Sequence, residues 1–209
     1  MDNIDFFFDP ICPWAWVTSR WVMGLKDQGV LNVNWRFISL KVVNAGRNYE
    51  LEFPSEYTQI HGFGHSMLRV AAMARHRGGN EAVETFYTAI GTEIHTRGRS
   101  RELVSGESIA DIVLQAGLET SLLGAFDDQS WDPVISAETE MALSRTGREV
   151  GTPIITFNPP EGPSLFGPVM SSIPRGADAL ELYGAYRTFA SRSDFYELKR
   201  AIRKAPSFE

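Results

Sequence analysis

The chain holds a single cysteine, and that cysteine lies where an apolar strand gives way to a helix. Residues 4–8 are a run of β-forming side chains that an Asp-Pro pair ends. From Trp14 onward apolar side chains recur at helical spacing, and Pro13 suits the first helical position because it lacks an N–H group that the first turn leaves unpaired. The sequence therefore predicts Cys12 at or next to the N-cap of a helix that runs to about Gly29.

A cysteine at a helix N-terminus has a chemical consequence. Free backbone N–H groups and the positive end of the helix dipole stabilise an anion there, and the thiolate is the reactive form of cysteine. We therefore expect Cys12 to ionise more readily than an ordinary cysteine and to act as a nucleophile. A lone cysteine is otherwise most often a small buried hydrophobic residue. The order strand, Cys-Pro, helix favours the reactive interpretation.

The position three residues after Cys12 holds Ala15, where paired-thiol sites carry a second cysteine. With one cysteine the chain cannot form an internal disulfide, so any thiol chemistry runs on one sulfur. We expect a smaller acid shift of Cys12 than in a dithiol protein, because alanine has no S–H group to bond the thiolate. An alanine here is also what a variant designed to trap mixed disulfides would carry.

Composition excludes several classes of function. The 209 residues are 43% hydrophobic and 22% charged, as in an ordinary globular protein, and the net charge of −6 leaves no electrostatic footprint for nucleic acid. Apolar runs are too short for a membrane span, and the N-terminus lacks the basic start of a secretion signal. We expect a cytoplasmic protein. His61 and His65 are four residues apart but flank glycines, so we expect no metal site.

The remaining pattern predicts an α/β fold interrupted by helices. A second strand at 32–38 completes a right-handed βαβ unit with parallel strands, and 41–54 is interpreted as a loop. Helical segments are expected at 66–77, 80–96, 108–116 and 132–147. We interpret 55–147 as a helical subdomain inserted into an α/β domain of residues 1–54 and 148–209.

The α/β pattern returns after residue 150. A strand at 151–157, a turn and a return strand at 164–167 form a predicted hairpin, followed by helices at 176–190 and 194–203. Pro153 has two interpretations. It simply opens its strand, or Thr152-Pro153 is a cis bond that turns backbone groups toward a substrate beside the sulfur.

The residues around Cys12 and Pro153 together resemble one protein family. The stretch Phe-Asp-Pro-Ile-Cys-Pro-Trp (8–14), the helical insertion and Gly-Thr-Pro (151–153) are similar to the DsbA family of the thioredoxin superfamily, in particular to the actinobacterial mycothiol-dependent nitroreductase group. Further matching segments are residues 18–21, 39–40, 94–95, 166–169, 173–176 and 195–200, together with Asn44 and Arg47. The resemblance covers nearly the whole chain.

The resemblance implies a thioredoxin fold (βαβ followed by ββα) with a large helical insertion. It implies that Cys12 is the attacking thiol of a site motif completed by Pro13, Trp14 and Ala15. Pro153, preceded by Thr152, is by position the cis-proline that shapes the substrate groove. The co-substrate is a low-molecular-weight thiol, mycothiol or glutathione, with no tightly bound cofactor. The substrate is a small molecule or a disulfide, and a homodimer is compatible with the family.

Four further residues are interpreted individually. Trp14 lies in the Cys-Pro-Trp turn, where an exposed indole would stack on a flat substrate. Asn44 and Arg47 lie in a loop that borders the expected groove, and an arginine there would bind a carboxylate in a bidentate way; solvated loop residues are the simpler interpretation. His95 is expected near a helix C-terminus, where the dipole favours a cation and a structural role.

The missing second cysteine leaves three hypotheses. The first is a monothiol oxidoreductase, in which Cys12 forms a mixed disulfide that an external thiol releases. The second is a kappa-type glutathione transferase or chromene-carboxylate isomerase, which holds the sulfur of a thiol cofactor with a single site residue. The third is a binding protein without redox activity.

Overall fold

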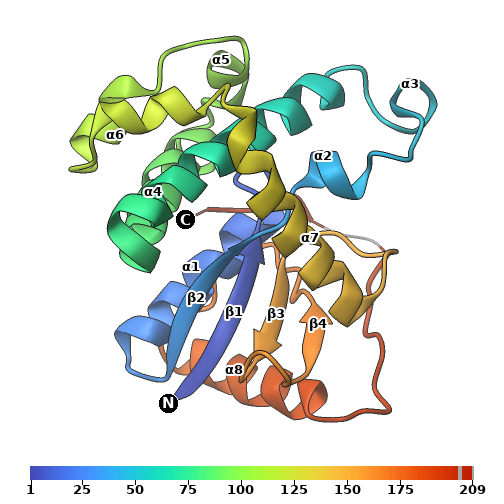
Figure 1. Ribbon diagram of the computed structural model, residues 1–209. Coiled ribbons are helices and arrows are strands. Elements are labelled where there is room, and N and C mark those ends of the chain that lie inside the picture. Colours follow the sequence, from blue (N-terminus) through green and yellow to red (C-terminus); the bar gives the residue numbers. More distant parts are fainter. Residues whose placement is uncertain (202–203, 209) are drawn as a thin grey trace.

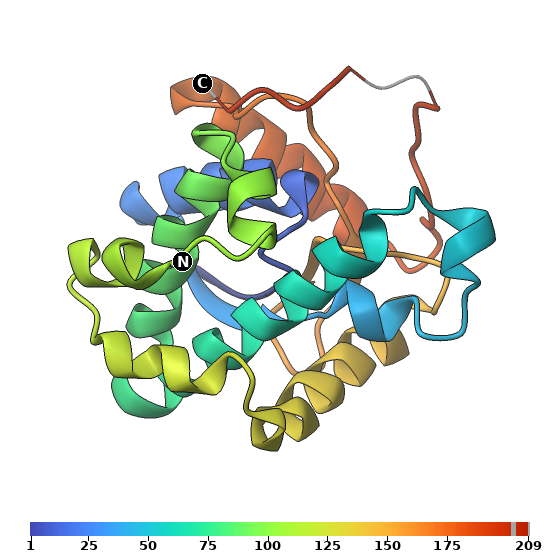
Figure 2. The same cartoon turned by 90° about the horizontal axis from the view of Figure 1, so that it is seen from above.

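The computed structural model describes residues 1–201 and 204–208. Its centre is a four-stranded sheet in the order β2-β1-β3-β4, with helices on both faces (Figures 1 and 2). The strands are β1 (Asp2–Phe8), β2 (Leu31–Phe37), β3 (Ile154–Phe157) and β4 (Ser164–Phe166). β1 is parallel to β2 and antiparallel to β3, and β4 is antiparallel to β3. This order confirms the predicted α/β class and the βαβ…ββα arrangement.

The last three residues of the central strand β1, Phe6, Phe7 and Phe8, are apolar without alternation because both faces of the strand are covered. Phe6 and Phe8 pack on the side of the larger core, where Phe8 stacks on Tyr87 with ring centroids 4.0 Å apart. Phe7 points to the opposite side and packs in a smaller cluster with Ile154. Alternate residues of one strand thus fill two cores, which fixes the register of the sheet.

Each face of the sheet has its own helices. α1 (Pro13–Asp27) and α8 (Gly176–Ala190) pack together on one face, and α7 (Asp132–Thr146) crosses the other (Figure 1). The prediction for α7 is confirmed, with Pro133 in its first turn and Gly147 as its C-cap at φ 91°. Tryptophans of α1 form much of the larger core: Trp16 and Trp21 are both buried.

The other helices gather beyond the C-terminal ends of β1 and β2 (Figure 1). α4 (Tyr57–Gly91) consists of two helical segments joined at a kink, where Gly79 has non-helical backbone angles (φ 68°, ψ −158°). The kink lies between the predicted helices 66–77 and 80–96, so the predicted break is confirmed, although the first segment begins earlier, at Tyr57. α4 continues as a π-helix, Thr92–Thr96. The remaining elements are α5 (Ser100–Val104), α6 (Ala110–Gln115) and the 3₁₀ turns Thr120–Ala125 and Gln129–Trp131.

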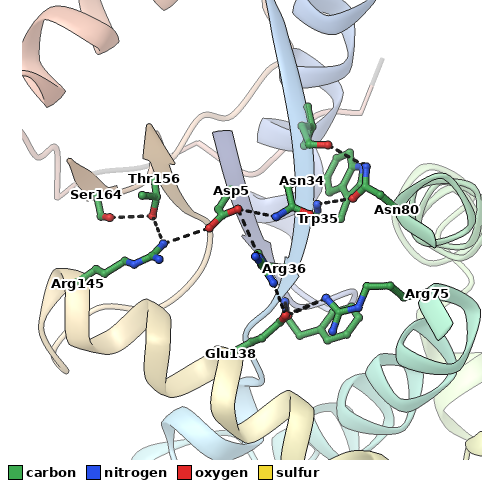
Figure 3. Close-up of polar contacts among 12 residues, drawn as sticks. Asp5, Asn34, Trp35, Arg36, Arg75, Asn80, Glu138, Arg145, Thr156 and Ser164 are labelled. Atoms are coloured by element: carbon green, nitrogen blue, oxygen red, sulfur yellow. Dashed lines mark hydrogen bonds and ion pairs between the residues drawn. The ribbon is translucent and has the colours of Figure 1, made fainter. Parts of the chain in front are cut away.

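A network of buried charges fastens α7 to the sheet (Figure 3). Arg36 of β2 donates to Glu138 of α7 at 2.8 Å and lies 3.4 Å from Asp5 of β1. Arg145 of α7 reaches the other oxygen of Asp5 at 3.2 Å, and Arg75 of α4 donates to Glu138 at 2.9 Å. The network joins α7 both to the sheet and to α4. The subdomain boundary after residue 147 therefore stays a prediction.

Two predictions of local structure are wrong. The predicted loop 41–54 contains the short helices α2 (Leu40–Val43) and α3 (Tyr49–Glu52), which Ser39 and Asn48 cap. The predicted helix 194–203 does not form over 194–201, and residues 202 and 203 lie outside the described residues.

The reason for the second error is packing. Phe195 stacks on Phe189 with centroids 4.7 Å apart, but Tyr196 and Leu198 are 86% and 74% exposed. These apolar side chains therefore have no apolar surface to pack against, and a short isolated helix is only marginally stable in water. Across the described residues, no helix has the length and apolarity needed to cross a membrane.

Candidate active site

Cys12 is the N-cap residue of α1, as predicted. Its backbone is extended (φ −81°, ψ 114°), and Pro13 begins the helix. The Sγ atom accepts a hydrogen bond from the backbone N–H of Ala15 at 3.5 Å. The same sulfur donates to the carbonyl oxygen of Thr152 at 3.4 Å. The first turn of the helix brings the Ala15 N–H to the sulfur, whereas the tertiary fold brings the Thr152 carbonyl there.

The second segment of the site precedes β3. The Thr152-Pro153 peptide bond is cis, so the cis interpretation of Pro153 is confirmed, and the proline also stands directly before the strand. Thr152 donates its hydroxyl to the carbonyl of Phe7 at 3.1 Å. The carbonyl of Pro153 accepts from the N–H of Gly167 at 2.8 Å. Bonds to β1 and to the end of β4 thus hold the segment against Cys12.

The expectation that Cys12 ionises readily is wrong for this structure. The residue is only 6% exposed, and burial raises the pKa of its thiol to about 12. The backbone N–H groups of Ala15 and Trp14 oppose this shift, and the nearby charge of Asp9 adds to it. The helix N-terminus favours the thiolate, as the sequence predicts, but desolvation of the buried sulfur has the larger effect on the pKa. At neutral pH the site holds an S–H group that donates to Thr152.

Asp9 is a site residue that the sequence analysis used only as the end of a strand. Its carboxylate is fully buried and accepts from the N–H of Ile11 at 3.1 Å and of Leu40 at 2.8 Å. Burial raises its pKa to about 7. Gly64 of α4 packs so closely that a Cβ atom there would lie 2.6 Å from the Asp9 Oδ1 atom. Asp9 therefore joins the loop before α1, the start of α2 and the long helix.

The predicted groove residues make local contacts. Asn44 is the C-cap of α2, and its Nδ2 atom donates to the carbonyl of Leu40 at 2.8 Å. Arg47 is exposed, pairs with Glu52 at 2.5 Å and lies over the ring of Phe53 at 5.1 Å. Trp14 is half-buried and packs against the larger core. A role in substrate binding stays a prediction for all three.

His95 is buried, and the expectation of a cation there is wrong. Burial lowers its pKa to about 4, so the ring is neutral. Its Nε2 atom lies 2.8 Å from the carbonyl oxygen of Pro10, in the loop that carries Cys12. The helix ends at Thr96, as the predicted range 80–96 requires, but its last turn, Thr92–Thr96, is π-helical, and His95 of this turn contacts the loop. Sequence spacing alone gives no sign of that turn.

The other histidines have partners within the protein. His61 contacts the hydroxyl of Tyr49 at 2.8 Å. His65 lies between Ser39 at 2.9 Å and Asp132 at 3.0 Å. That order of serine, histidine and aspartate resembles a hydrolase triad, but Ser39 is fully buried and caps α2. Among residues 1–201 and 204–208, no group of three His, Cys, Asp or Glu side chains is placed to hold a metal ion.

Adding a second thiol at position 15 should convert the site into a dithiol. Positions 12 and 15 are neighbours on the first turn of α1, and residues three apart on a helix lie within disulfide range. We expect Ala15→Cys to form an internal disulfide on oxidation and, when reduced, to lower the pKa of Cys12 by about one unit through an S–H bond. Thiol counting should give two thiols before oxidation and none after, on a monomer. Ala15→Ser is the control, with the lower pKa and no disulfide; disulfide-linked dimers alone would contradict the prediction.

A cysteine at a helix N-cap, facing a cis-prolyl segment on a βαβ…ββα sheet, defines a thiol protein of the thioredoxin fold with a DsbA-like helical insertion. The chain belongs to the family described as Rv2466c-like, mycothiol-dependent nitroreductase Rv2466c, whose model matches residues 11–200. It is therefore a thiol-dependent oxidoreductase.

Similar proteins agree with this placement. The uncharacterized protein Rv2286c of Mycobacterium tuberculosis is 32% identical over 204 residues, which are 96% of this chain and 82% of that protein. Among solved structures, 2-hydroxychromene-2-carboxylate isomerase has a TM-score of 0.60 at 14% identity, covering 89% of this chain and 93% of that one. The probable DsbA oxidoreductase SCO1869 from Streptomyces coelicolor has a TM-score of 0.57 at 16% identity, covering 96% and 95%. The two structures show the fold.

Proposed function

We propose that the protein is a mycothiol-dependent monothiol oxidoreductase with Cys12 as its nucleophile. The observation that carries this proposal is the contact of the Cys12 sulfur with both the α1 N-terminus and Thr152, in a chain with no second cysteine. In this proposal the backbone of Thr152 and Pro153 pairs with the substrate beside the sulfur. We further propose a cytoplasmic location, where a pool of low-molecular-weight thiol serves as co-substrate, and a homodimer, which light scattering would size.

The proposed cycle balances with one protein thiol. The Cys12 thiolate attacks a mixed disulfide between mycothiol and a substrate thiol. The S–S bond breaks, a disulfide between Cys12 and mycothiol forms, and the substrate thiolate leaves and takes up a proton. A second mycothiol thiolate then attacks this disulfide, which frees Cys12 and yields oxidised mycothiol. In net terms the substrate thiol is released, one free mycothiol is oxidised, both mycothiol units end in one disulfide, and the protein is unchanged.

The buried thiol has to lose its proton before the first step. The N–H groups of Ala15 and Trp14 already face the sulfur and favour the thiolate once solvent or substrate relieves the desolvation. Protonation of Asp9 removes the nearby negative charge that opposes ionisation. Because burial places the pKa of Asp9 at about 7, both of its protonation states are present near neutral pH.

The test is incubation of the folded protein with oxidised mycothiol, followed by intact-mass analysis. We expect the wild type to gain the mass of one mycothiol unit, which dithiothreitol removes. Cys12→Ser should gain nothing. Iodoacetamide labelling of the same sample under denaturing conditions checks that the thiol was free at the start. A wild-type protein that has a free Cys12 and takes up no mycothiol would contradict the proposal.

One observation favours a second candidate, a transferase or isomerase of the kappa type. Cys12 holds its proton and donates it to Thr152, so it is also placed to donate to the sulfur of a bound thiol cofactor. In that function a hydroxyl serves as well as a thiol. Conjugation or isomerase activity with mycothiol that survives in Cys12→Ser would select this candidate over the monothiol cycle.

A further inference from the structure

His95 contacts the active-site loop although it is distant from Cys12 in the sequence. Its Nε2 atom lies 2.8 Å from the carbonyl oxygen of Pro10, two residues before Cys12. A carbonyl oxygen only accepts hydrogen bonds, so the neutral ring carries its proton on Nε2 and donates it to Pro10. The same turn is closed by the N–H of Cys12, which donates to the carbonyl of Asp9 at 3.0 Å. The loop is thus held at two successive carbonyl groups.

The ring of His95 contacts two aromatic side chains. It stacks on Trp16 with centroids 5.9 Å apart and an interplanar angle of 26°, and the ring of Phe208 lies 5.7 Å away. Trp16 in turn donates its indole N–H to Thr96 of the π-helix at 3.3 Å. The π-helix therefore contacts the start of α1 through two neighbouring residues. Short π-helical turns within α-helices occur often at functional sites.

Donation by His95 has an electrostatic effect on the sulfur. It fixes the direction of the Pro10 carbonyl and offsets the partial negative charge of that oxygen, which otherwise opposes a thiolate nearby. Asp9 and Tyr87 are the titratable side chains that interact electrostatically with Cys12, and Arg20 lies over Trp16 at 4.1 Å from the ring centre. Losing the His95 bond leaves a buried carbonyl unpaired or lets the loop turn, and both changes disfavour the thiolate.

We propose that His95 is a positioning residue that sets the reactivity of Cys12 by holding the Pro10 carbonyl. The proposal rests on the proposed function only in taking Cys12 as the reacting group. It gives the π-helix a role in setting the reactivity of the thiol, in addition to its role in packing.

The test compares His95→Phe with His95→Gln. Phenylalanine keeps a ring beside Trp16 and Phe208 but has no donor, whereas the amide nitrogen of glutamine reaches the position of Nε2. The measurement is the rate of Cys12 alkylation by iodoacetamide from pH 7 to 10, with unfolding temperature measured alongside. We expect His95→Phe to react about tenfold more slowly, with its profile displaced by about one pH unit, and His95→Gln to recover most of the rate. Profiles of both variants that overlay the wild type would overturn the proposal, whatever their stabilities.

A measurement on the wild type covers the case in which a variant fails to fold. ¹⁵N NMR of labelled histidine should show His95 as the Nε2–H tautomer at pH 7, with a resonance that shifts when Cys12 is alkylated. The Nδ1–H tautomer, or a resonance insensitive to alkylation, would overturn the proposal. Alkylation needs no mycothiol. A protein that forms no mycothiol adduct but shows the His95 effect therefore contradicts the proposed function alone.

Discussion

Replacing Gly91 by alanine should cost about 3 kcal/mol of folding free energy, because the new methyl group would enter the ring of Trp16. An ideal Cβ at this position lies far inside contact distance of the Trp16 Cζ3 and Cε3 atoms and 3.0 Å from Cη2. The indole is 2% exposed and is contacted by Thr96, Arg20 and His95, which leaves it little room to move. The higher helix propensity of alanine offsets at most about 1 kcal/mol. Urea unfolding followed by circular dichroism measures the loss.

Gly62→Ala, in the first segment of α4, is the control. Gly62 has open space around its Cα atom, with nothing within 4 Å of an added Cβ. This variant should therefore gain up to about 1 kcal/mol from helix propensity alone. Equal stabilities of the two variants would show that the close approach of α4 to Trp16 is absent in solution. Because Trp16 also stacks on His95, we expect Gly91→Ala to slow the alkylation of Cys12.

Asp9 should make the protein less stable as the pH rises from 5 to 8. Burial raises the pKa of its carboxyl from 3.8 to about 7, so the folded state binds the proton more tightly than the unfolded chain does. The stabilising contribution is complete below pH 3.8 and is lost as the pH rises through 7. Between pH 5 and pH 8 the loss is about 2–3 kcal/mol. Asp9→Asn cannot ionise and should remove this slope from the free energy of unfolding.

Asp128→Asn is the control for this slope. Asp128 is exposed, and hydrogen bonding by the backbone N–H of Ser130 lowers its pKa. The ionised Asp128 carboxylate stabilises the folded state, and this effect is lost as the pH falls. Replacing Asp128 therefore changes the pH dependence of the free energy of unfolding in the opposite sense to Asp9→Asn and at lower pH. Denaturant unfolding at pH 5, 6, 7 and 8 compares the two variants with the wild type. A wild-type stability that stays level over this range would contradict burial of a titrating Asp9.

The sequence predicts the frame of the site well because that frame is local. A strand of β-formers, an Asp-Pro stop and a proline in the first helical turn place Cys12 at an N-cap without any knowledge of the rest of the fold. The hairpin after Thr152 follows from turn residues in the same way. Pairing of the two segments rests on the family resemblance, since no local pattern brings them together.

The properties that the sequence analysis misses depend on distant contacts. The pKa of Cys12 depends on how completely Thr152 and its surroundings cover the sulfur, which no spacing shows. His95 reaches Pro10 only because α4 continues as a π-helix past Gly91. The C-terminal apolar spacing from Phe195 to Leu198 is helical in pattern but lacks a surface to cover. In each case a tertiary contact, or its absence, decides against the local preference.

The bond between Cys12 and Thr152 joins residues that are 140 positions apart. Ribosomes add about 5–20 residues per second, so the thiol emerges roughly 7–30 s before the segment that covers it. β1 likewise has only β2 beside it until β3 is made. The nascent chain therefore exposes an unshielded thiol throughout its synthesis, and the yield of active protein depends on how reducing the translating cell is.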